Sequence, residues 1–288
     1  ESIHPEINAS ELYTHDNQAV EHLQKMGFGF AVTHVSDGIA QGTGALFALG
    51  VSNPNKQLIQ SEVAQFYSLE KGKSQQTYPS SQMGSIALLR QAFYDLEWYS
   101  NNTHKDQNIS LDRMQKNIGL PFIFETSDKW EILRAEKIAK EFGFSFNYLG
   151  SGNEYNAVNE LKKLGKHIIL PFNFPENYEL SDPYIVRQIP LSDLKHWELA
   201  PYNPYILTSN GIPICLTSRG QQNESTFWKN IKKAQEHGLS ANDALAALTT
   251  EPAKMVHIDD IAGTLEKGKK ACFSIYAANP FEEEAKIL

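Results

Sequence analysis

The sequence predicts an α/β protein that folds as a (β/α) barrel, and two observations support this. Between residues 121 and 237, segments with strand character alternate regularly with segments of helical periodicity. Repeated strand–helix units imply a parallel sheet with right-handed crossovers. The length of 288 residues then suits one large α/β domain with a small appendage. A doubly wound, flavodoxin-like sheet is the alternative that the pattern alone leaves open.

The part of the chain before residue 121 is less regular. Residues 52–79 are polar and include Pro54 and Pro79, so we expect a long loop there. The other elements expected are a helix at Asp16–Met26, strands at Phe28–Val35 and Ala45–Leu49, a helix at Ser81–Tyr99, and a helix that follows the polar break Asn101–Ser110 and ends at Ile118.

The alternating region gives the clearest elements. Its Pro-rich stretch between residues 172 and 211 is predicted to be irregular. The expected strands are Pro121–Glu125, Phe144–Leu149, His167–Pro171 and Ile212–Thr217, and the expected helices are Trp130–Phe142, Asn153–Leu164 and Thr226–His237.

Near the C-terminal end, a helix, a shorter helix and a strand are expected in succession. Ser240 suits a helix N-cap, with Asp243 three residues later. Pro252 suits the first turn of the short helix TEPAKMVHI. After a Gly-bracketed turn, apolar and polar residues alternate over Ala271–Tyr276, which predicts a strand.

This C-terminal stretch, GLSANDALAALTTEPAKMVHIDDIAGTLEKGKKACFSIY, resembles the end of the amidohydrolase superfamily of metal-dependent hydrolases, in its imidazolonepropionase-like branch. In that family an ALT-x-x-PA pattern lies in the last barrel helices, and G-x-L-x-x-G-x-x-A begins strands that return to a small β-sandwich. Similar segments, among them AVEHLQKMGFGFAVTHVSDG and ETSDKWEILRAEKIAKEFG, extend the resemblance over residues 10–280 with gaps. The residues that match the C-terminal pattern are Ala247–Thr249, Pro252, Ala253, Gly263, Leu265, Gly268 and Ala271.

The resemblance implies an amidohydrolase-type (β/α) TIM-like barrel over residues 1–260. Residues 261–288 would then be the return strand or strands of an incomplete β-sandwich. The segment Phe28–Val35 corresponds to the family's second strand, so the first is expected to be absent or to lie upstream of Glu1. We therefore expect a piece of a larger bacterial protein.

Catalysis in this family uses one or two divalent metals at the C-terminal mouth of the barrel, which activate water. The resemblance implies an H-x-H pair, one His on each of two middle strands, and an Asp on the last strand. None of the nine histidines forms an H-x-H pair. Glu125 stands where the first single His is expected, Gly150 where the second is expected, and Arg219 where the Asp is expected. Glycine offers no ligand and a guanidinium cannot bind a metal, so no metal ligand is assigned.

Two hypotheses follow. In the first, the chain is a degenerate, non-catalytic domain that serves as a structural or interaction module, without a cofactor. Its partner would be another amidohydrolase-like domain of the same polypeptide or a second copy. In the second, it is an active, zinc-dependent hydrolase of C–N bonds other than peptide bonds, whose first-strand histidines lie outside this chain and whose Glu125 is a ligand.

The residues expected at the mouth of the barrel are Glu125, Arg219, His34 and Glu154. The mouth could be a pocket in which Arg219 pairs with Glu125 or binds an anionic ligand, or Arg219 and Glu125 could form a structural ion pair that fills the space of a metal. No dinucleotide fingerprint or nucleophile elbow is present. His167, at the start of a strand, is expected to be structural.

The composition excludes several classes of protein. The net charge of −8, without a Lys/Arg stripe, argues against nucleic-acid binding. No stretch reaches the ~20 apolar residues of a membrane span, so a soluble protein of unassigned compartment, cytoplasmic or periplasmic, is expected. The two cysteines, Cys215 and Cys272, lie in apolar runs and are expected to be buried thiols.

Overall fold

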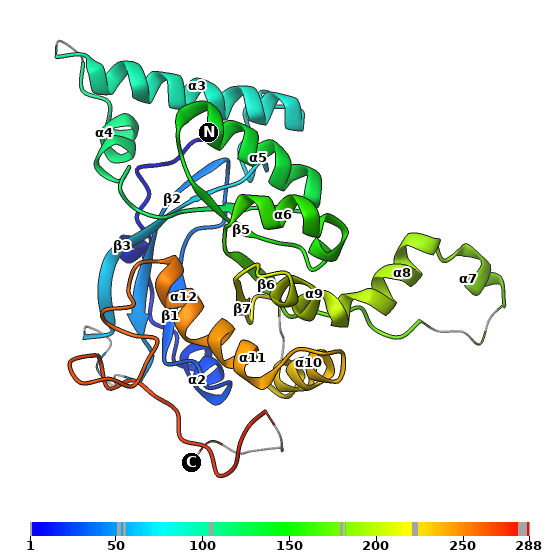
Figure 1. The fold of residues 1–288 in the computed structure, drawn as a ribbon. Helices are drawn as coiled ribbons and strands as arrows, with labels where there is room; N and C mark the ends of the chain where they lie inside the picture. Colours follow the sequence, from blue (N-terminus) through cyan, green and yellow to red (C-terminus); the bar gives the residue numbers. More distant parts are fainter. Residues whose placement is uncertain are drawn as a thin grey trace.

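The structure of the protein is a computed structural model, and it describes residues 2–50, 53, 56–103, 106–178, 181, 183–220, 224–281 and 287. Its centre is one curled seven-stranded sheet in the order β1-β2-β3-β4-β5-β6-β7, a half-barrel in which the strands follow the sequence (Figure 1). The strands are β1 (Phe30–Thr33), β2 (Ala40–Ala48), β3 (Leu58–Tyr67), β4 (Phe122–Glu125), β5 (Phe146–Leu149), β6 (Ile168–Pro171) and β7 (Ile214–Thr217).

The parallel half of the sheet, β3 to β7, confirms the alternation read from the sequence. Successive residues of β4 point to opposite faces of the sheet. Phe122 and Phe124 pack in a large core with the covering helices, whereas Ile123 packs in a second core on the other face. The covering helices are α3 (Gln82–Asn101), α5 (Lys129–Phe142) and α6 (Val158–Leu164), preceded by the 3-10 turn η2 (Glu154–Ala157).

The first three strands depart from the prediction, because β1, β2 and β3 form an antiparallel meander. The expectation of a loop over residues 52–79 is wrong, since β3 occupies part of it. The segment was not recognised as a strand because it contains the polar residues Gln60, Glu62 and Gln65. Gln65 is buried, and its side-chain amide donates to the carbonyl of Asn117 at 2.6 Å, so a polar residue satisfies its hydrogen bond inside the sheet.

The face of the sheet opposite to α3, α5 and α6 is closed by the chain's own C-terminal part. Met255 of helix α12 (Thr250–Met255) lies in one apolar cluster with Ile123, Leu149 and Cys215, and its Sδ is 3.9 Å from Cys215 Sγ. Cys215 is buried, as predicted, and Cys272 is half-buried. This packing fills the inner side of the half-barrel with apolar groups and leaves polar residues to the ends of the strands.

From Pro183 to Ser209 the Pro-rich stretch is mainly helical, which corrects the expectation of irregular structure there, whereas residues 172–178 form no helix or strand, as expected. Prolines stand at the starts of these helices, where the missing N–H removes no hydrogen bond. Figure 1 shows α7 and α8 projecting away from the sheet; we call residues 183–199 the arm. The helices are α7 (Pro183–Gln188), α8 (Leu191–Leu199), the 3-10 turn η3 (Ala200–Tyr202) and α9 (Asn203–Ser209).

The C-terminal elements match the prediction in part. The N–H of Asp243 donates to Ser240 Oγ at 3.0 Å, the expected cap of α11 (Ala241–Leu248). Residues 271–275 belong to no strand in the described chain, and Tyr276 forms one isolated bridge with Ile287. The division at residue 260 stays a prediction. The other helices are α1 (Ala9–Leu12), α2 (Asn17–Lys25), α4 (Ile109–Lys116) and α10 (Glu224–Glu236).

Candidate functional site at the carboxyl ends of the strands

Three of the predicted mouth residues come together at one edge of the sheet. Because β1 and β3 are both antiparallel to β2, β1 runs in the same direction as β3 to β7. His34 follows β1, Glu125 ends β4 and Arg219 lies two residues beyond β7. The carboxyl ends of these strands therefore meet at the same edge of the sheet. This brings Glu125 and Arg219, which are 94 positions apart in the sequence, into contact.

Glu125 is the centre of this network. Its Oε1 lies 2.8 Å from His34 Nε2, and Arg219 Nη1 donates to the same oxygen at 2.7 Å. Ser36 Oγ donates to Glu125 Oε2 at 3.1 Å and accepts from Arg219 Nη2 at 3.0 Å. We call His34, Ser36, Glu125 and Arg219 the mouth cluster.

Burial and charge act in opposite directions on Glu125. Burial raises the pKa of its carboxyl, but the hydrogen bonds from His34 and Arg219 and their charges outweigh burial, and the pKa falls to about 2. The side chains of His34 and Glu125 are each 15% exposed, whereas Arg219 is 45% exposed. Glu125 is thus an ionised carboxylate, held from inside by the imidazole and from the solvent side by the guanidinium.

Phe66 on β3 orients the imidazole of His34. The two rings stack with centroids 3.8 Å apart and planes 5° from parallel. The sequence analysis missed this residue because it lies in the segment predicted to be a loop. The cluster of strand-favouring residues Val63, Phe66 and Tyr67 at the end of β3 is the signal available in the sequence.

Glu154 does not belong to the mouth cluster. Its side chain is buried after β5, where Oε1 accepts from the N–H groups of Ser151 at 2.6 Å and Gly152 at 3.0 Å. Asn203 Nδ2 donates to Oε2 at 2.7 Å. Glu154 therefore holds the loop after β5 against α9.

The same carboxylate occupies the space beside Gly150. A Cβ atom at this position would lie 2.3 Å from Glu154 Oε1, closer than any side chain can approach. The local structure thus favours glycine where the family resemblance places a histidine, because any larger residue must displace Glu154 from its hydrogen-bond donors.

His167 lies at the other end of the sheet, as its position at the start of β6 predicts. Its Nε2 is 3.2 Å from Glu251 Oε2, and Lys254 Nζ is 2.7 Å from Glu251 Oε1. Burial lowers the pKa of His167, and Glu251 opposes this shift. This polar group therefore joins β6 to α12 and has no part in the mouth cluster.

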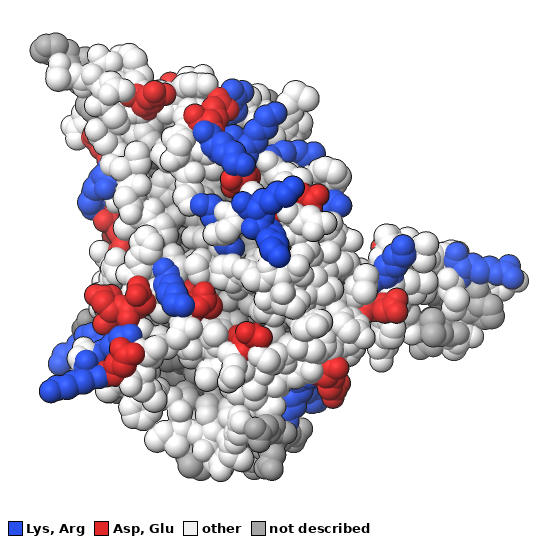
Figure 2. Space-filling model, in the orientation of Figure 1, with Lys and Arg blue, Asp and Glu red and all other residues white. Residues whose placement is uncertain are grey.

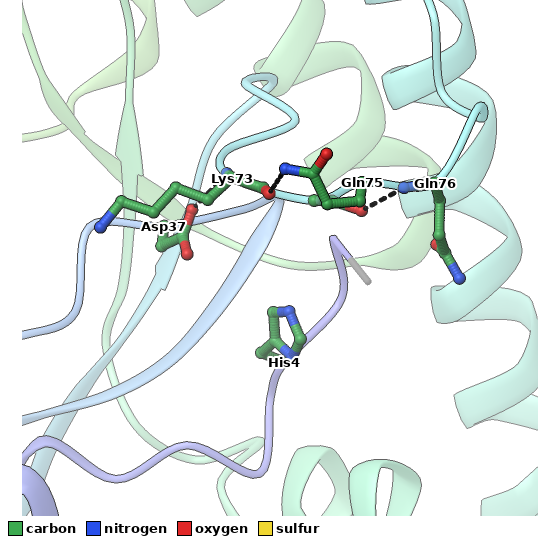
Figure 3. A pocket seen from close by; sticks show the side chains of 6 residues that line it. His4, Asp37, Lys73, Gln75 and Gln76 are labelled. Atoms are coloured by element: carbon green, nitrogen blue, oxygen red, sulfur yellow. Dashed lines mark hydrogen bonds between the residues drawn. The ribbon is translucent and has the colours of Figure 1, made fainter.

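A hollow of about 520 Å³, wide open to solvent, lies at Asp37, the residue after Ser36 of the mouth cluster, and Figure 3 shows the side chains around it. His4, Asp37, Lys73, Ser74, Gln75 and Gln76 line it. Asp37 Oδ1 accepts from the N–H of Lys73 at 2.8 Å and so ties the loop after β3 to the loop that carries Ser36. Within the described ranges, no three His, Cys, Asp or Glu residues gather closely enough to hold a metal.

Comparisons with known proteins agree with this fold. A family model described as "Amidohydrolase family" matches residues 135–287, more than half of the chain. An amidohydrolase from Thermotoga maritima MSB8 is similar in structure over 100% of this chain and 76% of its own length, with a TM-score of 0.80 at 18% sequence identity. No curated protein matches the sequence.

Two other solved structures show a weaker likeness. An uncharacterized metal-dependent hydrolase from Pyrococcus horikoshii OT3 has a TM-score of 0.42 at 17% identity over 60% of this chain. A Xaa-Pro dipeptidase has a TM-score of 0.38 at 17% identity over 61%. The chain spans only 37% and 53% of these two proteins. On the match of its C-terminal half to the family model, the chain belongs to the amidohydrolase family.

Proposed function

We propose that this chain is an amidohydrolase-family domain in which the mouth cluster stands in place of the catalytic metal centre. Such a domain is non-catalytic by itself and acts as a structural or interaction module of a larger protein. The observation that carries this proposal is the guanidinium of Arg219, which donates to Glu125 at 2.7 Å on the strand ends where a metal would bind.

The chemistry of the donor set supports the proposal. His34 and Glu125 are of ligand type, but each is already paired, and the third group that reaches them is a cation. A guanidinium has no lone pair to offer at neutral pH and would repel a dication placed beside it. The residues present therefore do not fit a divalent metal.

Gly150 gives independent support. A histidine there would have its Cβ 2.3 Å from Glu154 Oε1, so a ligand at this position requires Glu154 to leave its three hydrogen-bond donors. Buried carboxylates that lose their donors are destabilising by several kcal/mol. In the loop after β5, the carboxylate of Glu154 thus occupies the space that a side chain at position 150 would need.

The second candidate is a zinc-dependent hydrolase of non-peptide C–N bonds whose further ligands come from outside this chain. It is favoured by one observation, the pair of ligand-type groups His34 and Glu125 with 15% side-chain exposure each at the mouth. Under this alternative, Arg219 would have to turn away from Glu125 for a metal to bind.

Metal analysis separates the two candidates. We expect the purified protein, incubated with zinc and desalted, to retain none, and to leave a panel of cyclic amides and N-acyl substrates unhydrolysed. Arg219→Asp should raise zinc retention, because it replaces the cation with a carboxylate beside Glu125. Arg134→Asp, an exposed arginine on α5, is the matched control and should change nothing. Stoichiometric zinc in the unsubstituted protein would contradict the first candidate, the non-catalytic domain.

A further inference from the structure

Helices α2 and α8 are the α-helices of nine or more residues in the described chain for which no buried residue is recorded, and of these two only α8 lies on the projecting arm (Figure 1). Isolated helices of this length are marginal in water, because most helical stability in proteins comes from packing an apolar face. Helix α8 has such a face. It therefore needs a partner surface that the body of the molecule does not supply.

The apolar face consists of Leu191, Leu194 and Trp197, which are 67%, 39% and 37% exposed. At about 100° per residue, Leu191 and Trp197 lie roughly 60° to either side of Leu194. Ser192 lies on the opposite face. Figure 2 shows the arm as mainly uncharged, with basic and acidic side chains both present.

We propose that the arm is the interface of a homodimer, in which α8 packs antiparallel against α8 of a second copy with the twofold axis at Leu194. Closed dimers have a twofold axis, which requires the contact surface to fit itself. Here Leu194 meets Leu194 of the second copy. Leu191 of each copy lies at the level of Trp197 of the other, so the two apolar stripes overlap along their whole length.

Charge complementarity selects a second copy as the occupant. Lys195 and Glu198 lie on the same flank of the stripe, and both are exposed. In the antiparallel arrangement Lys195 of each copy leans toward Glu198 of the other, because helical side chains tilt toward their own N-termini. The chain as a whole carries −8, so most faces repel a second copy, whereas the charges of α8 (Asp193, Lys195, Glu198) nearly balance.

The area that this contact can bury indicates a weak dimer. A stable dimer buries about 1,600 Å² in total, more than two nine-residue helices of ~13 Å supply. In this arrangement α7 of each copy extends toward the body of the other and adds area. We expect a reversible dimer, whose mass rises with concentration.

This inference rests on the proposed function, because it names the partner that the interaction module would bind. Its test reads molecular mass and not metal content or hydrolysis, so the two can fail separately. The full chain is measured by sedimentation equilibrium over a concentration series. The unsubstituted protein should dimerise, Leu194→Glu should be monomeric, and Ser192→Glu on the opposite face should behave as the unsubstituted protein.

A charge exchange tests the identity of the partner. Lys195→Glu and Glu198→Lys should each weaken the dimer, because each places like charges across the flank. Mixed in equal amounts, the two variants should associate with each other, since both flanking pairs are then of opposite sign. Circular dichroism checks that each variant is folded.

Two results would overturn the proposal. One is a chain that stays monomeric at all concentrations, which would mean that a different protein or another part of the polypeptide covers α8. The other is a dimer that Leu194→Glu and the charge variants leave unchanged, which would place the interface elsewhere.

Discussion

At the scale of single residues, Glu125 shows how the mouth cluster stabilises the fold. Its carboxylate is mostly buried, yet its pKa is about 2, because His34 and Arg219 bind the ionised form. A pKa that is lower in the folded than in the unfolded state means that the unfolded state binds more protons between the two values. The stabilisation is therefore complete above the unfolded value of about 4.5 and is lost as the pH falls toward 2.

This gives a prediction for Glu125→Gln. The substitution removes the charge that holds Arg219, so we expect the free energy of unfolding at pH 7 to fall by about 1–3 kcal/mol. The difference from the unsubstituted protein should shrink as the pH is lowered from 4.5 toward 2. Urea denaturation at several pH values measures it. Glu160→Gln, at an exposed position on α6, is the control and should show little difference at any pH. A gap independent of pH would contradict the assignment.

Gly150 is the residue on which the loop after β5 depends. In Gly150→Ala the new Cβ meets Glu154 Oε1 at 2.3 Å, so the loop or the carboxylate must move. We expect a loss of about 1–3 kcal/mol in the free energy of unfolding, as in other overpacked sites. Gly119→Ala, where a Cβ meets nothing within 4 Å, is the control and should be neutral or slightly stabilising.

A double substitution tests the cause. Glu154→Ala alone should destabilise the protein, because Ser151, Gly152 and Asn203 lose their acceptor. Once it is present, Gly150→Ala should cost less than in the unsubstituted background. Additive effects of the two changes in thermal or urea denaturation would show that the clash with Glu154 is not the reason for glycine at this position.

At the scale of elements, the sequence predicts best where local pattern and tertiary role agree. The strands β4 to β7 are nearly continuous apolar runs between amphipathic helices, and each was located to within about two residues. In β3 the local pattern and the tertiary role disagree. Gln65 is polar but buried, because its side chain donates a hydrogen bond to the backbone of Asn117, 52 positions away. No local pattern reports such a partner.

The prolines of the arm and of the two helical turns that follow it mislead for a related reason. A proline ends a helix when it falls inside one but begins a helix when it falls in the first turn, and the sequence alone did not distinguish these cases for Pro183, Pro190, Pro201 and Pro204. The candidate site was found in part. The family resemblance aligns Glu125 and Arg219 with the carboxyl ends of two barrel strands, β4 and β7, whereas Phe66 and the capping role of Glu154 follow from contacts across the fold.

At the scale of the whole molecule, the half-barrel is closed from within. Met255, Val256 and Ile258 fill the inner side of the sheet, and the large helices cover the outer side, so the body has two apolar cores of its own. Over the residues that the structure describes, no helix is long and apolar enough to cross a membrane. Helix α8 contributes no buried residue to either core, and His196 Nδ1 on α8 contacts Tyr155 Oη of the body at 3.1 Å.

The body should therefore fold without the arm. We expect replacement of residues 181–199 by a flexible Gly/Ser linker to leave the melting temperature and the near-ultraviolet circular dichroism of the monomer almost unchanged, because no buried apolar side chain of α8 is lost. His196→Ala, which removes only the contact with Tyr155, is the matched control for the tie itself. The same deletion should abolish the concentration-dependent rise in mass. A deletion that unfolds the body would mean that the arm stabilises each single copy, and that α8 takes its place in the fold before any second copy binds.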